Sequence, residues 1–510
     1  MRFKSEGQAQ ANSCVVVLVY EKVISVKLLV DKARDRVIFA ESDHEFIDIL
    51  LSFLTLPIGS VVGLISPDST AIGSLTTLYK SVSTLESRHL RTVHCKDMLL
   101  NPRNEAAAQC SELKINVEPL GPVKFYTCYP SWCSLRRRRL GTVLGLLCRE
   151  CNYGVNERVE VKAEKGGKDG CEGGGVFVTD GAFRFMVTDD LQVMVGSTAA
   201  CHSLFQRLGI NDGNKVEQRT LELGEQEVLC LLKYALLSKS TLTEAILKIQ
   251  CSNAQDIINF HPKRTPQPDK DAGAGNTKNM TLKLFESKSM NKDLYAEAGV
   301  DVVDFLFSFL TYPLGSIIKL LGKNSGFGCM DNLFKSAEDL GTEGYLKSKE
   351  CRNMLLCPKL APFHSIGNQL LQIEEASSSL YYNEGWTMGD ANNQPEENRV
   401  LGVVMDPISE TGEVEAGKGY VNAAAGTFMI LNDLHVMPFS AVEHVELLKK
   451  MDLPINDVVE RVVTVGHDEA LNLLNASLIS KTTLSDVFNR RETGADTRFS
   501  IVDGVGGWPS

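Results

Sequence analysis

Four cysteines lie close together in the first third of the chain, at a spacing typical of a metal site. Four residues separate Cys128 from Cys133, two separate Cys148 from Cys151, and fourteen separate the two pairs. Two close pairs of thiolates supply the four soft ligands that tetrahedral zinc prefers. The spacing therefore predicts one structural zinc ion at these cysteines, with Cys171 as a substitute ligand. The alternative is a group of unrelated reduced thiols.

A run of four arginines lies between the two cysteine pairs, at Arg136, Arg137, Arg138 and Arg139. From Lys124 to Lys162 the chain has eight basic and three acidic residues, a local charge of +5. Such a run could bind nucleic acid or an acidic partner, although charged loops are more often only solvated. Few aromatic residues nearby could stack on bases. Binding through Arg136–Arg139 is therefore an alternative rather than the leading prediction.

The composition predicts a soluble intracellular protein, cytoplasmic or nuclear. Hydrophobic residues make up 43% and charged residues 23% of the 510 residues, which is typical of globular proteins. The net charge of −11 argues against broad binding to nucleic acid or anionic membranes. The apolar run Cys14–Tyr20 is too short to span a bilayer and has no signal cleavage site. Fourteen cysteines in so long a chain do not indicate a disulfide scaffold.

Four blocks of sequence occur twice, in the same order. The pairs are SFLTLPIGS with SFLTYPLGS, CKDMLLNP with CRNMLLCP, FMVTDDLQVM with FMILNDLHVM, and LLSKSTLTEAI with LISKTTLSDVF. The shift is 256 residues for the first two pairs, then 243 and 242. The chain is therefore interpreted as two tandem related domains, repeat 1 over residues 23–250, with its cysteine cluster within 124–171, and repeat 2 over residues 280–490.

Three segments fall outside the two repeats. Residues 1–22 are predicted to be an N-terminal extension, residues 251–279 a linker rich in proline, glycine and charge, and residues 491–510 a flexible tail. Repeat 2 has no cysteines where repeat 1 has its cluster. The metal is therefore not expected to be essential to the repeated fold.

Each repeat is expected to be α+β. It opens with two β-branched runs around a polar turn, VKLLV and VIFAE in repeat 1, which predict a hairpin. Two more strands are expected around TDDL and LNDL, followed by helices. The expected fold therefore has mainly antiparallel strands with packed helices, and a small four-cysteine ribbon inserted in the first repeat.

An amphipathic helix follows each hairpin and should end at or before Thr55 in repeat 1. Polar residues recur on it at spacings of three and four, and we expect Asp48 and its counterpart Asp304 to be solvated. Pro57 stops the helix and Gly59 permits the turn. If Gly59 has a positive φ, Gly59→Val should cost about 1 kcal/mol or more. This corner is interpreted as scaffold.

Taken together, the repeated blocks resemble a plant family of unknown function, DUF674. The resemblance rests on VKLLVDK, VIFAE, SFLTLPIGS, CKDMLLNPRN, VTDDLQVM and LLSKSTLTEAIL and extends over both repeats. The family carries a cysteine cluster after a Phe-Tyr pair, matched here by Phe125, Tyr126 and Cys128. The second cysteine pair departs from the family's closer spacing. The resemblance implies no activity and no catalytic residues.

No enzyme signature is present: the sequence has no Walker A motif, no HExxH and no GxSxG. Cys95, matched by Cys351, is interpreted as a small buried hydrophobe. The leading interpretation is a non-enzymatic interaction or scaffold protein with protein partners and a structural zinc ribbon. The alternatives are an undetected enzyme that uses a cleft of one repeat, and a nucleic-acid binder. A deep pocket with convergent polar groups would favour the enzyme.

Overall fold

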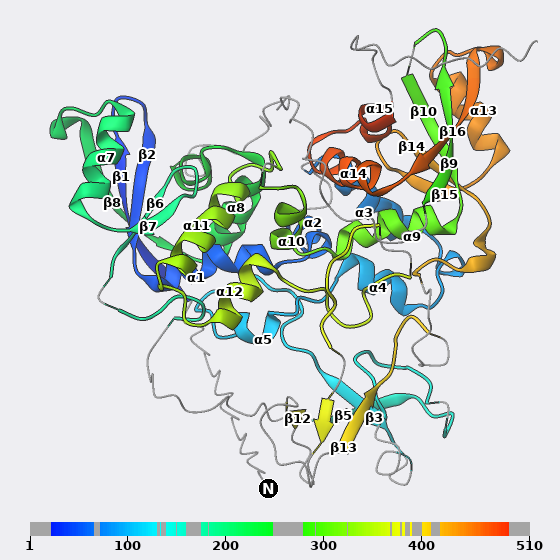
Figure 1. Cartoon of the computed structure of the whole chain (residues 1–510), viewed down its shortest axis with the longest axis horizontal. Helices are drawn as coiled ribbons and strands as arrows, with labels where there is room; N and C mark the ends of the chain where they lie inside the picture. Colours follow the sequence, from blue (N-terminus) through cyan, green and yellow to red (C-terminus); the bar gives the residue numbers. More distant parts are fainter. Residues whose placement is uncertain are drawn as a thin grey trace, which may run out of the picture.

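The structure is a computed structural model of the whole chain (Figure 1). It describes residues 22–65, 72–129, 133, 139–148, 150–159, 175–181, 183–247, 279–290, 292–323, 325–367, 370–377, 380–382, 388–389, 400–409 and 419–488. The predicted tail, and all but one residue each of the predicted extension and linker, lie outside the described residues. Below, the first half means the described residues up to 247 and the second half those from 279.

Two five-stranded antiparallel sheets have the same strand order. Sheet 1 has the order β7-β6-β2-β1-β8 and sheet 2 the order β15-β14-β10-β9-β16. The strands of sheet 1 are β1 (Ile24–Asp31), β2 (Arg36–Ser42), β6 (Phe185–Thr188), β7 (Val193–Val195) and β8 (Val216–Leu223). Those of sheet 2 are β9 (Met280–Ser287), β10 (Lys292–Ala298), β14 (Phe428–Leu431), β15 (Val436–Pro438) and β16 (Val458–Val465). The predicted α+β class is confirmed.

The two predicted hairpins are the centres of these sheets. Strand β1 alternates buried and exposed side chains at its start, as a strand with one face on the core requires. Its turn contains Asp35 at φ 45°, and the Asp31 carboxylate accepts a hydrogen bond from the Ala33 N–H at 2.9 Å. The register of the β1–β2 pair shifts between Leu29 and Val30. The register of the β9–β10 pair shifts at the matching place, between Asp293 and Tyr295. The two hairpins therefore share even their irregularity.

Helices follow each hairpin in a similar order. In the first half these are α1 (His44–Ser52), the short η1 (Phe53–Thr55), α2 (Ile58–Ile65), α3 (Leu75–Thr84), α4 (His94–Leu100) and α5 (Ala107–Cys110). In the second half they are α9 (Val300–Ser308), η5 (Phe309–Thr311), α10 (Leu314–Leu320), α11 (Met330–Thr342) and α12 (Lys349–Leu356). Helix α1 ends at Ser52 and η1 at Thr55, so the prediction that the helix ends at or before Thr55 is confirmed.

Further helices complete each half. They are α7 (Thr198–Leu208), α8 (Glu225–Leu237) and the π-turn η4 (Thr243–Leu247) in the first half, and α13 (Ala441–Lys450), α14 (His467–Ile479) and α15 (Thr483–Phe488) in the second. On sheet 1 Leu204 of α7 packs with Met186, and on sheet 2 Leu448 of α13 packs with Met429. Helices α7 and α13 therefore cover one face of sheets 1 and 2, respectively.

The two halves exchange helices. Helix α11 of the second half lies against α1 and β7, and α3 of the first half lies against α9 and β15 (Figure 1). The Val193 N–H donates to the Ser336 hydroxyl, and the Val436 N–H donates to the Ser81 hydroxyl, both at 2.9 Å. One hydrophobic core contains residues of both halves. Each sheet is therefore completed by a helix from the other half.

The two matching corners, at Pro57 and Pro313, join the halves. The Ile58 N–H donates to the Tyr312 carbonyl, and the Leu314 N–H donates to the Leu56 carbonyl, both at 3.0 Å. Gly59 lies inside α2, so the expectation that it permits a turn is wrong, and the condition of a positive φ is not met. A Cβ at Gly59 would lie 2.8 Å from the backbone oxygens of Leu310 and Leu99. Glycine is required here because two chain segments approach closely.

Asp48 and Asp304 are buried, so the expectation that they are solvated is wrong. The Asp48 carboxylate accepts hydrogen bonds from the N–H groups of Val176, Phe177 and Val178. Asp304 accepts from the N–H groups of Tyr420 and Val421, at 2.7 and 2.8 Å. Burial raises the pKa of both carboxyl groups, to about 7 for Asp304. Each aspartate holds a loop rather than facing water.

Candidate metal centre

A small ribbon in the first half holds the four predicted cysteines. Strand β3 (Phe125–Cys128) pairs with β5 (Val155–Val159), and Tyr126 pairs with Gly141 next to β4 (Arg139–Leu140). Cys128 is the last residue of β3. Cys148 and Cys151 lie in the turn that precedes β5. The pairing of β3 with β5 therefore brings Cys128 close to the turn that contains Cys148 and Cys151.

A tight turn positions the second cysteine pair. The Asn152 N–H donates to the Cys148 carbonyl at 2.7 Å, and the Cys148 N–H donates to the Tyr153 carbonyl at 3.0 Å. Asn152 has φ 55°, a left-handed conformation that asparagine tolerates better than most residues. Cys148 and Cys151 thereby face the same side of the loop.

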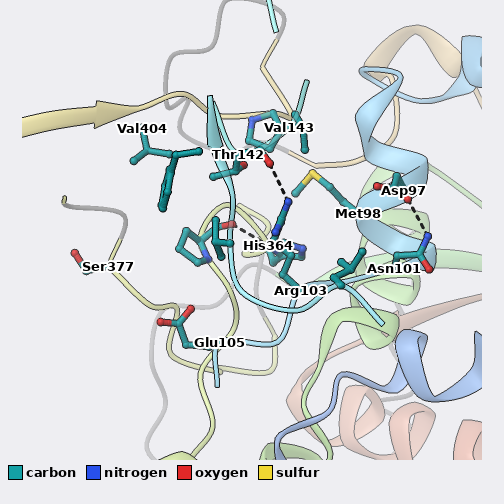
Figure 2. Close-up of a pocket in the computed structure, with 15 residues that line it drawn as sticks. Asp97, Met98, Asn101, Arg103, Glu105, Thr142, Val143, His364, Ser377 and Val404 are labelled. Carbon is teal, nitrogen blue, oxygen red and sulfur yellow. Dashed lines mark hydrogen bonds between the residues drawn. The ribbon is translucent and has the colours of Figure 1, made fainter. Parts of the chain in front are cut away.

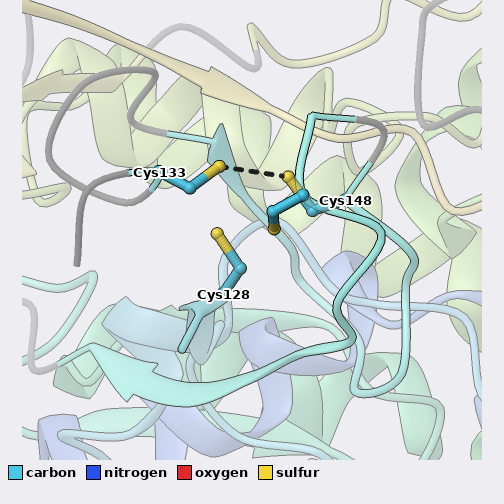
Figure 3. A group of neighbouring side chains, drawn as sticks. Cys128, Cys133 and Cys148 are labelled. Carbon is cyan, nitrogen blue, oxygen red and sulfur yellow. Dashed lines mark hydrogen bonds between the residues drawn. The ribbon is translucent and has the colours of Figure 1, made fainter. Parts of the chain in front are cut away.

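The four sulfur atoms lie within 4.8 Å of one another, and the Sγ atoms of Cys133 and Cys148 are 3.6 Å apart (Figure 3). This is far beyond the roughly 2.05 Å of a disulfide bond, and all four are free thiols. Four thiolates around a metal with bonds of about 2.3 Å would have their sulfurs about 3.5–4 Å apart. The group would fit such an ion after its longest sulfur–sulfur separation shortened by about 1 Å. Among the described residues it is the one group of this kind.

Burial and backbone donors determine the protonation of these thiols. Cys128, Cys133 and Cys148 are buried, whereas Cys151 is half-buried. Burial raises the pKa of Cys128 to about 11 and that of Cys133 further. Burial also opposes ionisation of Cys148, but the N–H groups of Cys151 and Glu150 donate to its sulfur and lower its pKa. Backbone N–H groups directed at a thiolate sulfur stabilise its charge.

The ribbon has little apolar core of its own. Its buried cluster contains Leu146, Val155 and Met405 besides the cysteines. Met405 belongs to the second half and is fully buried, and its N–H donates to the Leu140 carbonyl at 2.7 Å. It follows β13 (Val400–Val404), which pairs with β4 in parallel. The ribbon is therefore joined to the second half by both a strand and a side chain.

Three strands of the second half join β4 of the ribbon in a small sheet. Strand β11 (Leu380–Tyr382) pairs with β12 (Met388–Gly389) and with β13, and the order is β12-β11-β13-β4. In Figure 1 these strands lie beside β3 and β5, apart from the two large sheets. The strands themselves contain no cysteine. The second half therefore supplies strands to this region, while all four cysteines of the group belong to the first half.

A family model described as "Protein of unknown function (DUF674)" matches residues 20–468. The match extends over most of the chain and includes both halves. This chain belongs to the DUF674 family. No curated protein and no solved structure matches it.

The remaining predicted site residues of this DUF674 chain differ in their outcome. Cys171 and Arg136–Arg138 lie outside the described residues. Arg139 is in β4, and its guanidinium lies 3.6 Å from the Glu150 carboxylate, with 17% of its side chain exposed. Arg139 is therefore held within the ribbon. Cys95 is buried, and burial raises the pKa of its thiol, as expected for an inert cysteine.

Sequence analysis did not identify Met405 as part of the ribbon of this DUF674 chain. Met405 is 257 residues from Cys148 in the sequence, and no local pattern marks it. The preceding β-branched run at Val400, Val403 and Val404 indicates a strand but not its partner. No helix within the described residues is long and apolar enough to cross a membrane.

Proposed function

We propose that this protein is a non-enzymatic interaction or scaffold protein, with a structural zinc ion bound by Cys128, Cys133, Cys148 and Cys151. The observation that carries the proposal is the convergence of four thiols within 4.8 Å. A set of four sulfur ligands without an open position is typical of structural zinc, whereas catalytic sites keep one position for water. Unoxidised thiols fit a reducing compartment, the cytoplasm or nucleus.

Zinc would stabilise a ribbon whose own core is small. Apart from the cysteines, the buried cluster consists of Leu146, Val155 and Met405. Apparent binding energies of structural zinc are on the order of 10 kcal/mol, enough to order a module of this size. Because Met405 and β13 come from the second half, the ion would also fix the ribbon to that half.

The ribbon presents apolar side chains to solvent. Tyr129, Leu144, Leu147 and Tyr153 are 54–76% exposed. They are four of the twelve large hydrophobic side chains that are exposed among the described residues, and they fall within 25 residues of sequence. Tyr129 and Leu147 are directly next to Cys128 and Cys148. Exposed aromatic and leucine side chains close together in one module are typical of a protein-binding surface.

Charge indicates the kind of partner. The segment from Lys124 to Lys162 carries +5, whereas the whole chain carries −11. An acidic protein segment with apolar side chains would complement both the charge and the exposed apolar residues. We therefore propose an acidic protein partner rather than nucleic acid, for which base-stacking aromatics are sparse.

A second part of the proposal concerns origin. The two sheets share strand order and the site of their pairing irregularity, and the corner at Pro57 is matched at Pro313. This supports a tandem duplication within the chain. After it, the second half would have lost the cysteines or the first would have acquired them.

The metal is tested by analysis of the purified full-length protein. We expect about one zinc ion per chain, and a content near zero for Cys148→Ser with Cys151→Ser. The matched control is Cys201→Ser with Cys230→Ser, because these half-buried cysteines lie outside the group. A wild-type protein that carries no zinc after growth in zinc-containing medium would overturn the metal assignment.

The partner is tested by quantitative affinity purification from native tissue with three forms of the protein. Leu147→Ser with Tyr153→Ser should lose an acidic protein that the wild type retains, while its zinc content is unchanged. Val442→Ser is the control, because Val442 is 66% exposed but lies on α13, far from the ribbon in sequence. The same proteins retained by all three forms would contradict docking on the ribbon.

A further inference from the structure

A cavity of about 180 Å³ lies where the first half, the ribbon and the second half meet (Figure 2). Met98 of α4 contributes from the first half, Phe125 and Val143 from the ribbon, and Val404 and His364 from the second half. No single half could form it alone. Met98 and Val404 are 306 positions apart in the sequence, and no local pattern indicates that they line one cavity.

The cavity has an apolar interior and an acidic mouth. Met98 and Val404 are buried, as is His364, whose Nδ1 lies 3.0 Å from the Pro362 carbonyl oxygen. Asp97 and Glu105, which also line the cavity, are exposed and so lie toward solvent. A ligand would therefore place an apolar body inside and pass two carboxylates on entry.

Arg103 is the cation of this cavity. Its guanidinium donates one hydrogen bond, to the Thr142 carbonyl at 2.8 Å. Within the described parts of the chain it forms no ion pair within 4.0 Å, although arginine offers five N–H donors. Burial lowers its pKa. A half-buried guanidinium with donors to spare is suited to a carboxylate, which it can bind through two parallel hydrogen bonds.

The matched position in the second half is different. Lys359, 256 residues after Arg103, is 45% exposed in its side chain and pairs with Glu374 at 2.7 Å. Its charge is therefore compensated at the surface. The second half has the same fold with a surface lysine at this position. The fold alone therefore does not require a half-buried arginine at position 103.

Size narrows the choice of ligand. An apolar cavity of about 150 Å³ in another protein holds one benzene ring. The present cavity therefore has room for one six-membered ring, or a short branched chain, with a single carboxylate. The acidic mouth disfavours ligands with a second negative charge.

We propose that this cavity binds a small monocarboxylate with an apolar body. The carboxylate pairs with Arg103, and the ring or chain packs against Met98, Val143 and Val404. This goes beyond the scaffold role, because it assigns a small-molecule site to the junction of the halves. A pocket with convergent polar groups is also what an enzyme would need, but the binding step is the one that the residues support.

Calorimetric titration of the full-length protein with benzoate tests this site. We expect benzoate to bind with a Kd of about 1 mM or lower, and neutral benzamide, which has the same shape, at least tenfold more weakly. Arg103→Gln should weaken benzoate at least tenfold and leave benzamide unchanged, because only the charge pairing is lost. Lys359→Gln, the matched control, should bind benzoate as the wild type does.

A second variant keeps the test decisive if Arg103→Gln disturbs the ribbon. Val404→Phe fills the apolar interior and should abolish binding of both probes, while Arg103→Lys should restore part of the benzoate affinity. Zinc content measured for each variant separates ribbon loss from loss of the arginine. Equal affinity for benzoate and benzamide, or no binding of benzoate up to about 20 mM, would overturn the proposal.

Discussion

Pro57 lies opposite Pro313 in an antiparallel β-bridge, with its neighbours hydrogen-bonded in both directions at 3.0 Å. Two copies of one sequence block therefore meet at the junction of the halves. The block therefore joins the two halves and does more than end one helix. A side chain added in this block consequently meets backbone segments of both halves.

Gly59→Ala should destabilise the protein, although alanine normally favours a helix interior over glycine by about 0.5–1 kcal/mol. The added Cβ would lie 2.8 Å from two backbone oxygens that cannot rotate away. We expect a loss of about 1–3 kcal/mol in the free energy of unfolding, measured by chemical denaturation. Gly213→Ala is the control, because no atom lies within 4 Å of its added Cβ. A Gly59→Ala protein as stable as the wild type would show that the corner can open.

The exchange of helices predicts that the halves remain together when the chain is cut. A protease site placed within residues 251–278 should give two fragments on a denaturing gel but one species of full mass in native size exclusion. The reason is that α11 completes sheet 1 and α3 completes sheet 2. Separate elution of the fragments under native conditions would mean that each half folds around its own helices.

Asp304 predicts a pH dependence of stability. Its pKa is raised to about 7 by burial, so the native state keeps this proton at pH values where the unfolded chain, with a pKa near 3.8, has released it. The contribution of Asp304 is therefore fully present below about pH 4 and is lost as the pH rises to about 7. The change is on the order of a few kcal/mol.

Asp304→Asn should flatten this part of the pH profile, measured by denaturation between pH 4 and pH 8. Asparagine keeps an acceptor oxygen for the Tyr420 and Val421 N–H groups, both of which donate to Oδ1. Asp339→Asn, at an exposed position of α11, serves as control and should leave this part of the profile as it is. Identical profiles for wild type and Asp304→Asn would refute the assignment.

Chelation of the proposed zinc ion should loosen the ribbon without unfolding the sheets. Hydrogen exchange should become faster in residues 125–159 and also in 400–408, because Met405 and β13 are packed on the ribbon. Residues 24–42 and 280–298 should keep their protection, since their core is the large cluster shared by the halves. Loss of protection in both hairpins would mean that the metal supports the whole fold, contrary to our expectation.

The elements that depend on local sequence were predictable. Strand periodicity identified the hairpins, and cysteine spacing identified the group that the structure brings within 4.8 Å. Asp48 was misplaced because its partners, the N–H groups of residues 176–178, lie 128–130 positions away. The exchange was not predictable for a different reason. Helices α3 and α11 share the pattern Leu-aromatic-Lys-Ser, at residues 78–81 and 333–336, so this local pattern does not show which sheet each helix covers.

Because of the helix exchange, sheet 1 cannot be completed during translation until α11 of the second half has been synthesised. Strand β7 ends at Val195, but α11, which covers it, begins at Met330, so 330 − 195 = 135 further residues must be translated first. At about 5–20 residues per second this takes roughly 7–27 s. During that interval the nascent first half exposes apolar surface that its own helices do not cover. The ribosome-bound protein should therefore depend on chaperones until the second half emerges.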